Sequence, residues 1–206
     1  MYVVIVLWAA AVSFGAMQLW RYESTPGTEA SAPISWPADA HIPRQPGLPT
    51  LIVLIHPQCP CSRATLGELA KLMTDCNGKL TTTVLILRPS GEPAGWEKTD
   101  LWSSAAAIPG VNVQTDDEGA AARLFGAATS GQTLLYAPDG RLLFSGGITE
   151  SRGHSGDNAG RSAITALVLN RSPLSNVSLV QTPVYGCSLF SGSDAAHQQE
   201  CNVCRK

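Results

Sequence analysis

Two cysteines, Cys59 and Cys61, stand where a short apolar run gives way to an amphipathic one. Residues 51–55 (LIVLI) have the composition of a short buried strand, and apolar residues at helical spacing begin after residue 62. A helix start carries a partial positive charge and free N–H groups, which lower the pKa of a thiol placed there. The pattern therefore predicts a reactive cysteine pair, able as thiolates to attack a disulfide or to bind a metal.

The spacing of the pair leaves open which cysteine attacks. The motif is C-x-C with Pro60 in the middle, whereas redox pairs usually have the spacing C-x-x-C. In one register Cys59 is the attacking thiol, and in the other Pro60-Cys61 matches the end of the usual motif, with Gln58 in place of its first cysteine. A disulfide across so short a ring is strained and easily reduced, so the pair would be oxidising if it forms. The alternative is a buried pair without chemistry.

Three more cysteines, Cys187, Cys201 and Cys204, lie near the C-terminus among small and polar residues that suggest a mobile segment. The last two form a C-x-x-C followed by arginine, so the c-type haem motif is incomplete. Three sulfurs are too few for a closed zinc site unless His197 joins them, and a second redox pair is equally compatible. Alternatively, Cys187 forms a disulfide that ties the tail to the domain, for example with Cys76, whose place at a helix end does not activate it.

Strands and helices are expected to alternate from residue 51 onward. The last two strands are joined by Asp139-Gly140, a strong hairpin signal. Alternation of this kind predicts a mostly parallel sheet, to which the closing hairpin adds antiparallel pairing. The expected strands are 51–55, 82–88, 111–115, 132–137 and 141–145, and the expected helices are 62–75, 97–107, 118–125 and 157–170.

The N-terminal residues predict a membrane anchor over 1–22. Residues 1–20 carry no charge and have about the length that spans a bilayer as a helix. The start is not basic and the nearest A-x-A, residues 30–32, is followed by Pro33, so an uncleaved anchor is favoured over a cleaved signal peptide. The proline-rich residues 23–50 predict an extended spacer.

Two segments carry a resemblance to a known superfamily. LIVLIHPQCPCSRATL (51–66) and FGAATSGQTLLYAPDGRLLFSGG (125–147) resemble thioredoxin-like proteins, especially membrane-tethered thiol–disulfide proteins and peroxiredoxin relatives. The resemblance covers 51–170 and implies a three-layer α/β/α sandwich with a mixed sheet, followed by a cysteine-containing tail over 171–206. The chain also looks like bacterial proteins labelled RedB, in the segments HPQCPCSRA, SGQTLLY and RGHSGDN.

One residue departs from the pattern of that superfamily. The family normally carries a cis-proline just before the hairpin strand, facing the reactive cysteine, and the matching residue here is Gln132. A cis bond before a non-proline residue costs about 3 kcal/mol, so a trans peptide is predicted. The family's cis-proline loop commonly positions substrate peptide and keeps metals away. Its absence weakens the implication of reductase activity and favours metal binding.

The loop at 146–160 is expected beside the cysteines, because in the implied fold the last strand runs parallel to the cysteine strand. There Arg152 would favour thiolate, and His154 would act as a base or ligand. The alternative is a glycine-rich surface turn in which Asp157 or Asn158 caps the last helix.

These observations predict a thiol–disulfide oxidoreductase anchored by one helix in the inner membrane, its domain on the periplasmic or other extracytoplasmic side. Its partner would be a protein thiol or disulfide, and the formal net charge of -2 gives no indication of nucleic acid. The alternative is a copper chaperone that passes Cu(I) to a receiving partner, with Cys59, Cys61 and His56 or His154 as ligands. A lone histidine such as His56 is, however, more often satisfied locally. A redox-inactive module would leave the CPC turn unexplained.

Overall fold

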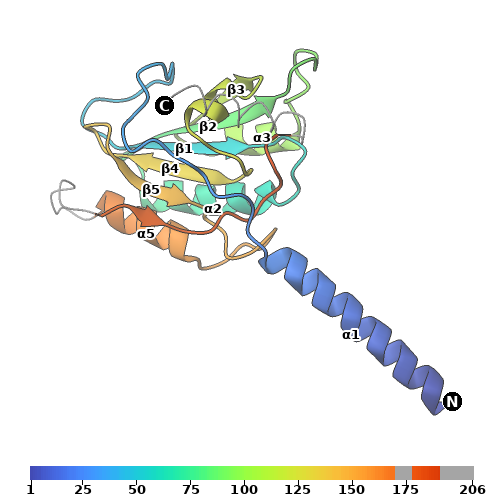
Figure 1. Ribbon diagram of the computed structural model, residues 1–206. Coiled ribbons are helices and arrows are strands. Elements are labelled where there is room, and N and C mark those ends of the chain that lie inside the picture. Colours follow the sequence, from blue (N-terminus) through green and yellow to red (C-terminus); the bar gives the residue numbers. More distant parts are fainter. Residues whose placement is uncertain (170–177, 191–206) are drawn as a thin grey trace, which may run out of the picture.

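A computed structural model describes residues 1–169 and 178–190 of the chain (Figure 1). Its regular elements follow the predicted alternation, and each predicted helix and strand is found within three residues of its expected bounds. In chain order the elements are α1 (Tyr2–Ser24), β1 (Thr50–Ile55), α2 (Ser62–Asp75), β2 (Thr81–Arg88), α3 (Asp100–Ala106), β3 (Val111–Asp117), α4 (Ala120–Leu124), β4 (Gln132–Tyr136), β5 (Leu142–Gly146), α5 (Ala159–Leu169) and β6 (Val180–Gln181).

The strands form one mixed sheet in the order β3-β2-β1-β4-β5-β6. β1, β2 and β3 are parallel to one another, and β4 is antiparallel to both of its neighbours, β1 and β5. β5 therefore runs parallel to β1, as expected, and the segments that follow these two strands leave the sheet at the same edge. This edge carries the cysteines.

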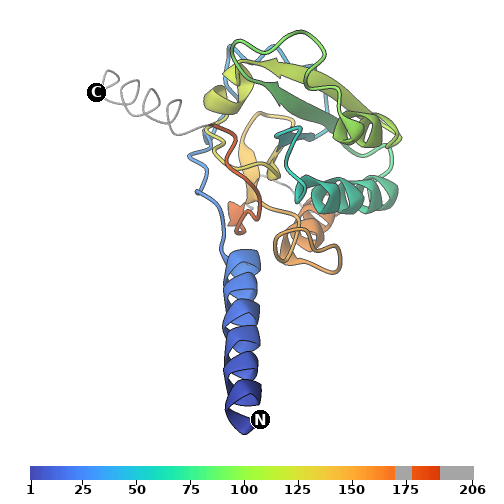
Figure 2. The same ribbon diagram turned by 90° about the vertical axis from the view of Figure 1, so that its right-hand side faces the viewer.

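Side chains from both faces of the sheet form the core. The six residues of β1 are all buried, because the strand lies between β2 and β4 and is covered on both sides. On one face the core is made with α2, α3 and α5 (Figure 2). On the other face it is made with α4 and with segments before β1 and after β6. The three-layer arrangement that the resemblance implied is thus present.

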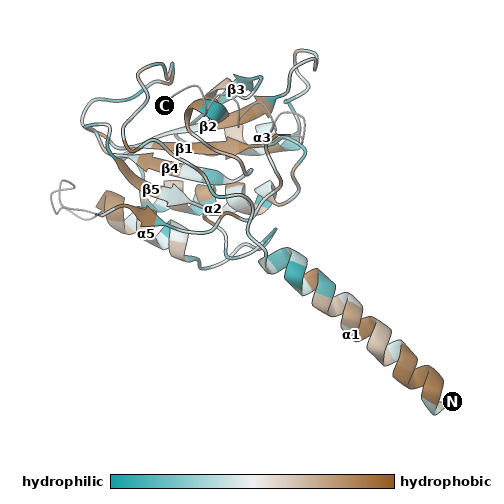
Figure 3. Ribbon diagram, in the orientation of Figure 1, coloured by the Kyte–Doolittle hydropathy of each residue, from teal (hydrophilic) through white to brown (hydrophobic). Residues whose placement is uncertain are grey.

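Helix α1 projects away from this domain (Figure 3). It has 23 residues, all but one of them exposed, and an apolar surface. Among the described helices it alone has the length and composition to span a membrane, although a signal sequence would meet the same criteria. The helix therefore suits either an anchor or a signal.

The proline-rich segment before β1 is not a free spacer, which differs from the prediction. Trp36 packs edge-on against Phe125 and Tyr136, and the hydroxyl of Tyr136 donates to Pro33 O at 3.0 Å. Ser31 N donates to Gly126 O at 2.9 Å. The segment completes the layer over the second face of the sheet, which α4 alone is too short to cover.

Residues 178–190 also differ from the mobile tail that the sequence predicted. β6 adds a short parallel strand beside β5, and Leu189 and Phe190 are buried in the core of the second face. Between these two contacts the chain runs beside the segment that follows α1 (Figure 2), and Gly27 N donates to Val184 O at 2.8 Å.

Candidate functional site

The cysteine pair occupies the turn that joins β1 to α2. Cys59 N donates to His56 O at 3.0 Å, and Ser62 N donates to Cys59 O at 3.1 Å, so the turn leads directly into the helix. Both thiols are reduced and buried, with Cys59 only 1% exposed and Cys61 8% exposed. The predicted location at a helix start is therefore the observed one.

Donors from two segments converge on the sulfur of Cys59. Cys187 N lies 3.4 Å from Cys59 Sγ and donates to it, and Ser62 and the thiol of Cys187 also hydrogen bond to this sulfur. Burial acts to raise the pKa of Cys59, but these hydrogen bonds outweigh it and leave the pKa below the ordinary value of a thiol. Among the four described cysteines, Cys59 is thus the one whose surroundings favour thiolate.

Cys61 has the opposite tendency. Burial raises its pKa, and the neighbouring Cys59 raises it further, while the guanidinium of Arg152 acts in the other direction. A thiolate at Cys59 and a protonated thiol at Cys61 are mutually compatible, because the second can donate to the first. The two registers that the spacing left open are therefore not equivalent in the folded chain.

Ser130, a residue that the sequence analysis missed, organises the turn from the opposite side. His56 N donates to Ser130 Oγ at 2.7 Å, and Ser130 Oγ lies 2.8 Å from Ser62 Oγ. Because Ser130 Oγ accepts from the backbone, its own proton is available to Ser62, whose proton can then point to Cys59. The sequence feature that could have identified Ser130 is its position two residues before the expected cis-proline site.

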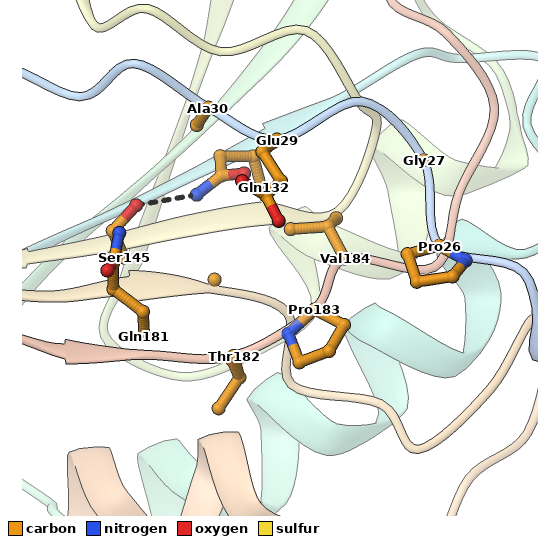
Figure 4. Close-up of a pocket in the computed structure, with 11 residues that line it drawn as sticks. Pro26, Gly27, Glu29, Ala30, Gln132, Ser145, Gln181, Thr182, Pro183 and Val184 are labelled. Carbon is orange, nitrogen blue, oxygen red and sulfur yellow. Dashed lines mark hydrogen bonds between the residues drawn. The ribbon is translucent and has the colours of Figure 1, made fainter.

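Gln132, at that site, follows a trans peptide as predicted, since the described residues contain no cis bond. Its side chain is buried, and Nε2 donates to Ser145 Oγ at 3.2 Å while Oε1 has no partner. The residue lines a cavity of about 280 Å³ between β5, the segment after α1 and residues 181–184, with Glu29 nearby (Figure 4).

The loop after β5 does lie beside the cysteines, through Arg152. Its guanidinium is near Cys61 and Cys187, and it donates through Nη1 to Gly186 O and through Nε to Thr25 O at 3.2 Å. The loop therefore joins the thiol site to the end of α1.

His154, in the same loop, occupies a different place from the one predicted. Its Nε2 lies 3.4 Å from Glu23 Oε2, at the end of α1, and its side chain is more than half exposed. Asn158 Oδ1 accepts from Arg161 N at 2.7 Å and so caps α5. Of the two residues predicted at the thiols, Arg152 therefore lies there and His154 does not, and the alternative prediction of a helix cap is met by Asn158.

His56 is satisfied locally. Its Nδ1 accepts from Gln58 N at 3.2 Å, its ring packs edge-on against Trp96, and burial lowers its pKa. Within the described ranges no group of three or more His, Cys, Asp and Glu side chains could hold a metal ion. The predicted histidine ligands are therefore not found at the thiols, since His56 is satisfied within its own turn and His154 pairs with Glu23. Cys201 and Cys204, together with His197, lie outside the described residues.

Cys76 and Cys187 are not bonded to one another. Both are reduced, and Cys76 is fully buried under α5, where burial raises its pKa. Cys187 lies at Cys59 instead. The alternative of a structural Cys76–Cys187 disulfide is therefore wrong for this structure, and Cys76 belongs to the core.

Comparisons with known proteins give structural neighbours only. No family model matches the chain, and no curated protein matches it. An uncharacterised conserved protein from Geobacillus kaustophilus superimposes with a TM-score of 0.58 and 17% identity, over 82% of this chain and 94% of that chain. A hypothetical protein from Sinorhizobium meliloti gives 0.56 and 20%, over 82% and 96%.

A third neighbour has a descriptive name. The exposed lipoprotein thioredoxin Etrx1 of Streptococcus pneumoniae gives a TM-score of 0.44 and 14% identity, over 59% of this chain and 84% of that chain. Likeness at this level says nothing of function. The strand order, the flanking helices and the cysteine turn before α2 together identify the chain as thioredoxin-like in fold.

Proposed function

We propose that this protein is a membrane-anchored, extracytoplasmic thiol–disulfide oxidoreductase in which Cys59 is the attacking thiolate. The observation that carries the proposal is the convergence of hydrogen-bond donors from Ser62 and Cys187 on Cys59 Sγ at the start of α2. A thiolate held by donors at a helix start is the nucleophile of disulfide exchange.

In the reaction the Cys59 thiolate attacks one sulfur of a substrate disulfide. The substrate S–S bond breaks, a mixed disulfide forms at Cys59, and the leaving thiolate takes a proton. A second thiol of the protein then attacks Cys59 Sγ, and the second substrate thiol leaves. Two protein thiols are oxidised and one substrate disulfide is reduced to two thiols. The reverse sequence oxidises a substrate dithiol. Along the chain, Cys61 is the cysteine nearest to Cys59 and so the first candidate for the second thiol.

The anchor is part of the proposal, with α1 crossing the membrane and the cysteines outside the cytoplasm. Cleavage after Ala32 would remove Gly27 and Ser31, whose backbone groups pair with Val184 and Gly126. A retained N-terminus keeps these contacts. Oxidising compartments are also where such exchange is needed, and a protein thiol or disulfide is the proposed substrate.

The test is disulfide exchange by the full-length chain in detergent, with a peptide disulfide as substrate and dithiothreitol as reductant. Replacing Cys59 by serine removes the nucleophile and should lower the exchange rate by about 100-fold or more. The matched control is Cys76→Ala, which removes a buried thiol at the opposite end of α2 from the turn and should leave the rate near that of the wild type.

Two results would contradict the proposal. One is a Cys59→Ser chain that exchanges disulfides as fast as the wild type. The other is a reduced wild-type chain that binds Cu(I) tightly under anaerobic conditions and does not exchange disulfides, which would favour the copper carrier.

A further inference from the structure

The segment that covers the cysteine turn is the C-terminal strap, which we define as residues 182–190. It follows β6 and pairs antiparallel with the loop that precedes β4. Ser130 N donates to Cys187 O at 2.8 Å, and Leu189 N donates to Ala128 O at 2.8 Å. The strap is therefore positioned by backbone hydrogen bonds, and these bonds fix where the side chain of Cys187 lies.

Gly186 lets the strap approach this closely. A Cβ at Gly186 would lie 1.9 Å from Ser130 O, a distance that no side chain tolerates. The carbonyl of the same residue accepts from Arg152 Nη1. The glycine and the arginine together seat the next residue, Cys187, against the cysteine turn.

The consequence for Cys59 is twofold. Its residue surface is only 1% exposed, so a substrate disulfide cannot reach it while the strap is seated. At the same time the N–H of Cys187 lies 3.4 Å from its sulfur, and the two thiols hydrogen bond to each other. The strap residue in contact with Cys59 therefore itself carries a thiol.

We propose that Cys187 is the resolving cysteine of this protein and that a Cys59–Cys187 disulfide is its oxidised form. This inference rests on the proposed function and names the thiol that completes it. Substrate reaches Cys59 when the strap lifts, and the return of the strap brings Cys187 to the mixed disulfide. The Cys187 thiolate attacks Cys59 Sγ, the Cys59–substrate bond breaks, and the substrate leaves as a thiolate that takes up the proton released by Cys187.

The charge at Cys59 is, after burial, one of the factors that keep Cys187 protonated. Burial, and then its hydrogen bond and repulsion with Cys59, raise the pKa of Cys187 to about 12 in the reduced protein, while Arg152 acts to lower it. Cys187 is therefore protonated as long as Cys59 is a thiolate. Once Cys59 is in a mixed disulfide it no longer carries a negative charge. The part of the increase in the Cys187 pKa that this charge causes is then lost. Arg152 remains beside Cys187 and favours its ionisation at that stage.

Cys61 is less suited to this role. A Cys59–Cys61 bond would close a ring through a single intervening residue, Pro60, which stores strain in the turn. Cys187 comes from a separate segment, so the turn need not distort. Cys61 stays in place as the protonated neighbour of Cys59.

The experiment maps the disulfides of the full-length wild-type chain. The protein in detergent is reduced, freed of reductant, treated with one equivalent of oxidised glutathione and quenched with acid and alkylating agent. Digestion with trypsin and chymotrypsin under non-reducing conditions separates the Cys187 peptide from those of Cys201 and Cys204. Mass spectrometry should find Cys59 joined to Cys187 as the main product, and the same product in a Cys61→Ser chain.

Variants measure the resolving step directly. In Cys187→Ser the glutathione mixed disulfide at Cys59 should persist at least about tenfold longer than in the wild type, because the attacking thiol is missing. The matched control is the double variant Cys187→Ser with Ser188→Cys. It keeps a thiol on the strap but moves it to the next side chain, which points to the opposite side of an extended segment. The double variant should therefore not shorten the lifetime of the mixed disulfide relative to Cys187→Ser alone.

The outcomes separate the two proposals. A Cys59–Cys61 bond in the wild type, or a bond from Cys187 to Cys201 or Cys204, overturns the role of Cys187 and leaves the proposed function intact. A glutathione mixed disulfide at Cys59 that decays in Cys187→Ser as fast as in the wild type also overturns the role of Cys187 and leaves the proposed function intact. A chain whose Cys59 never forms a glutathione adduct overturns both. Because the mapping uses the wild type, the test does not depend on how well any variant folds.

Discussion

Neutral donors rather than a neighbouring cation surround the sulfur of Cys59. The backbone N–H and thiol of Cys187 reach it from the strap, and Ser62, supported by Ser130, reaches it from α2. Hydrogen bonds to a charged group are worth more than those between neutral groups, and they lower the pKa of the group that accepts them. The guanidinium of Arg152 acts on Cys61 and Cys187 instead.

The first prediction concerns Ser62, whose hydroxyl donates to this sulfur. Ser62→Ala removes one donor to the thiolate and none to the thiol form, so the pKa of Cys59 should rise by about one pH unit. Ultraviolet absorbance of the thiolate, followed from acidic to alkaline pH, measures the shift. Near neutral pH the exchange rate should fall by less than the loss of thiolate, because a more basic thiolate is also more nucleophilic.

The control for this variant lies on the same helix. Thr74→Ala removes an exposed hydroxyl that donates to Ala70 O near the far end of α2, and the titration of Cys59 should not change. An unchanged titration in Ser62→Ala as well would mean that the hydroxyl does not contribute to the acidity of Cys59.

At the scale of elements, a buried carboxylate joins α2 to α5 and to the loop after β5. Glu68 is fully buried, its Oε2 lies 2.9 Å from Arg161 Nε, and its Oε1 accepts from Gly156 N at 2.9 Å. Asn158 and Lys71 complete the set of partners. These bonds fix the loop that carries Arg152, so the geometry of the thiol site depends on them.

The second prediction is that Glu68→Gln destabilises the fold. The substitution keeps the size of the side chain but removes the buried carboxylate partner of Arg161, whose remaining partners, Asp157 and Asp75, have exposed side chains. The loss of this buried pair should lower the free energy of unfolding by about 3 kcal/mol. Denaturant unfolding of the full chain in detergent, followed by far-ultraviolet circular dichroism, measures the loss.

Lys71→Ala provides the comparison for Glu68→Gln. Lys71 is about half exposed (51%) and also bonds to Glu68, but a pair with one exposed partner is worth less than about 1 kcal/mol. Equal losses of unfolding free energy in the two variants would show that the buried pair of Glu68 with Arg161 stabilises the fold no more than the exposed pair with Lys71.

At the scale of the whole molecule, the segment after α1 and the C-terminal strap meet beside the thiol site. Gly27 N pairs with Val184 O, and Thr129 Oγ1 donates to Thr28 O at 2.9 Å. Arg152 N also donates to Glu23 O at 3.0 Å. The site, the strap and the C-terminal end of α1 therefore share one network of contacts.

The third prediction is that the N-terminus is retained. Cleavage near residue 33 would remove Gly27, Thr28 and Ser31, which hydrogen bond to the folded domain, and Ala32, which packs on its second face. Intact mass of the protein extracted from membranes should correspond to a chain that includes α1, and the protein should resist extraction at alkaline pH. A mature N-terminus near residue 33 would show that α1 is a cleaved signal.

Local patterns in the sequence were enough for the elements and for the cysteine turn. Periodicity of apolar residues predicted the strands and helices, and the change of pattern at residues 55–62 placed Cys59 and Cys61 at a helix start. Both are properties of contiguous residues, so no knowledge of distant contacts was required. The parallel direction of β1 and β5, and with it the position of Arg152, came from the superfamily resemblance.

The partners of these residues were decided only by the tertiary structure. Cys187 approaches Cys59 through backbone hydrogen bonds of the strap, and backbone groups leave no mark in the pattern of side chains. Glu68 gave a weak signal, as a charged residue on the apolar stripe of α2, but its partner Arg161 is distant in the chain. The proline-rich segment has no periodicity, and the sheet face that it covers exists only once the strands have paired.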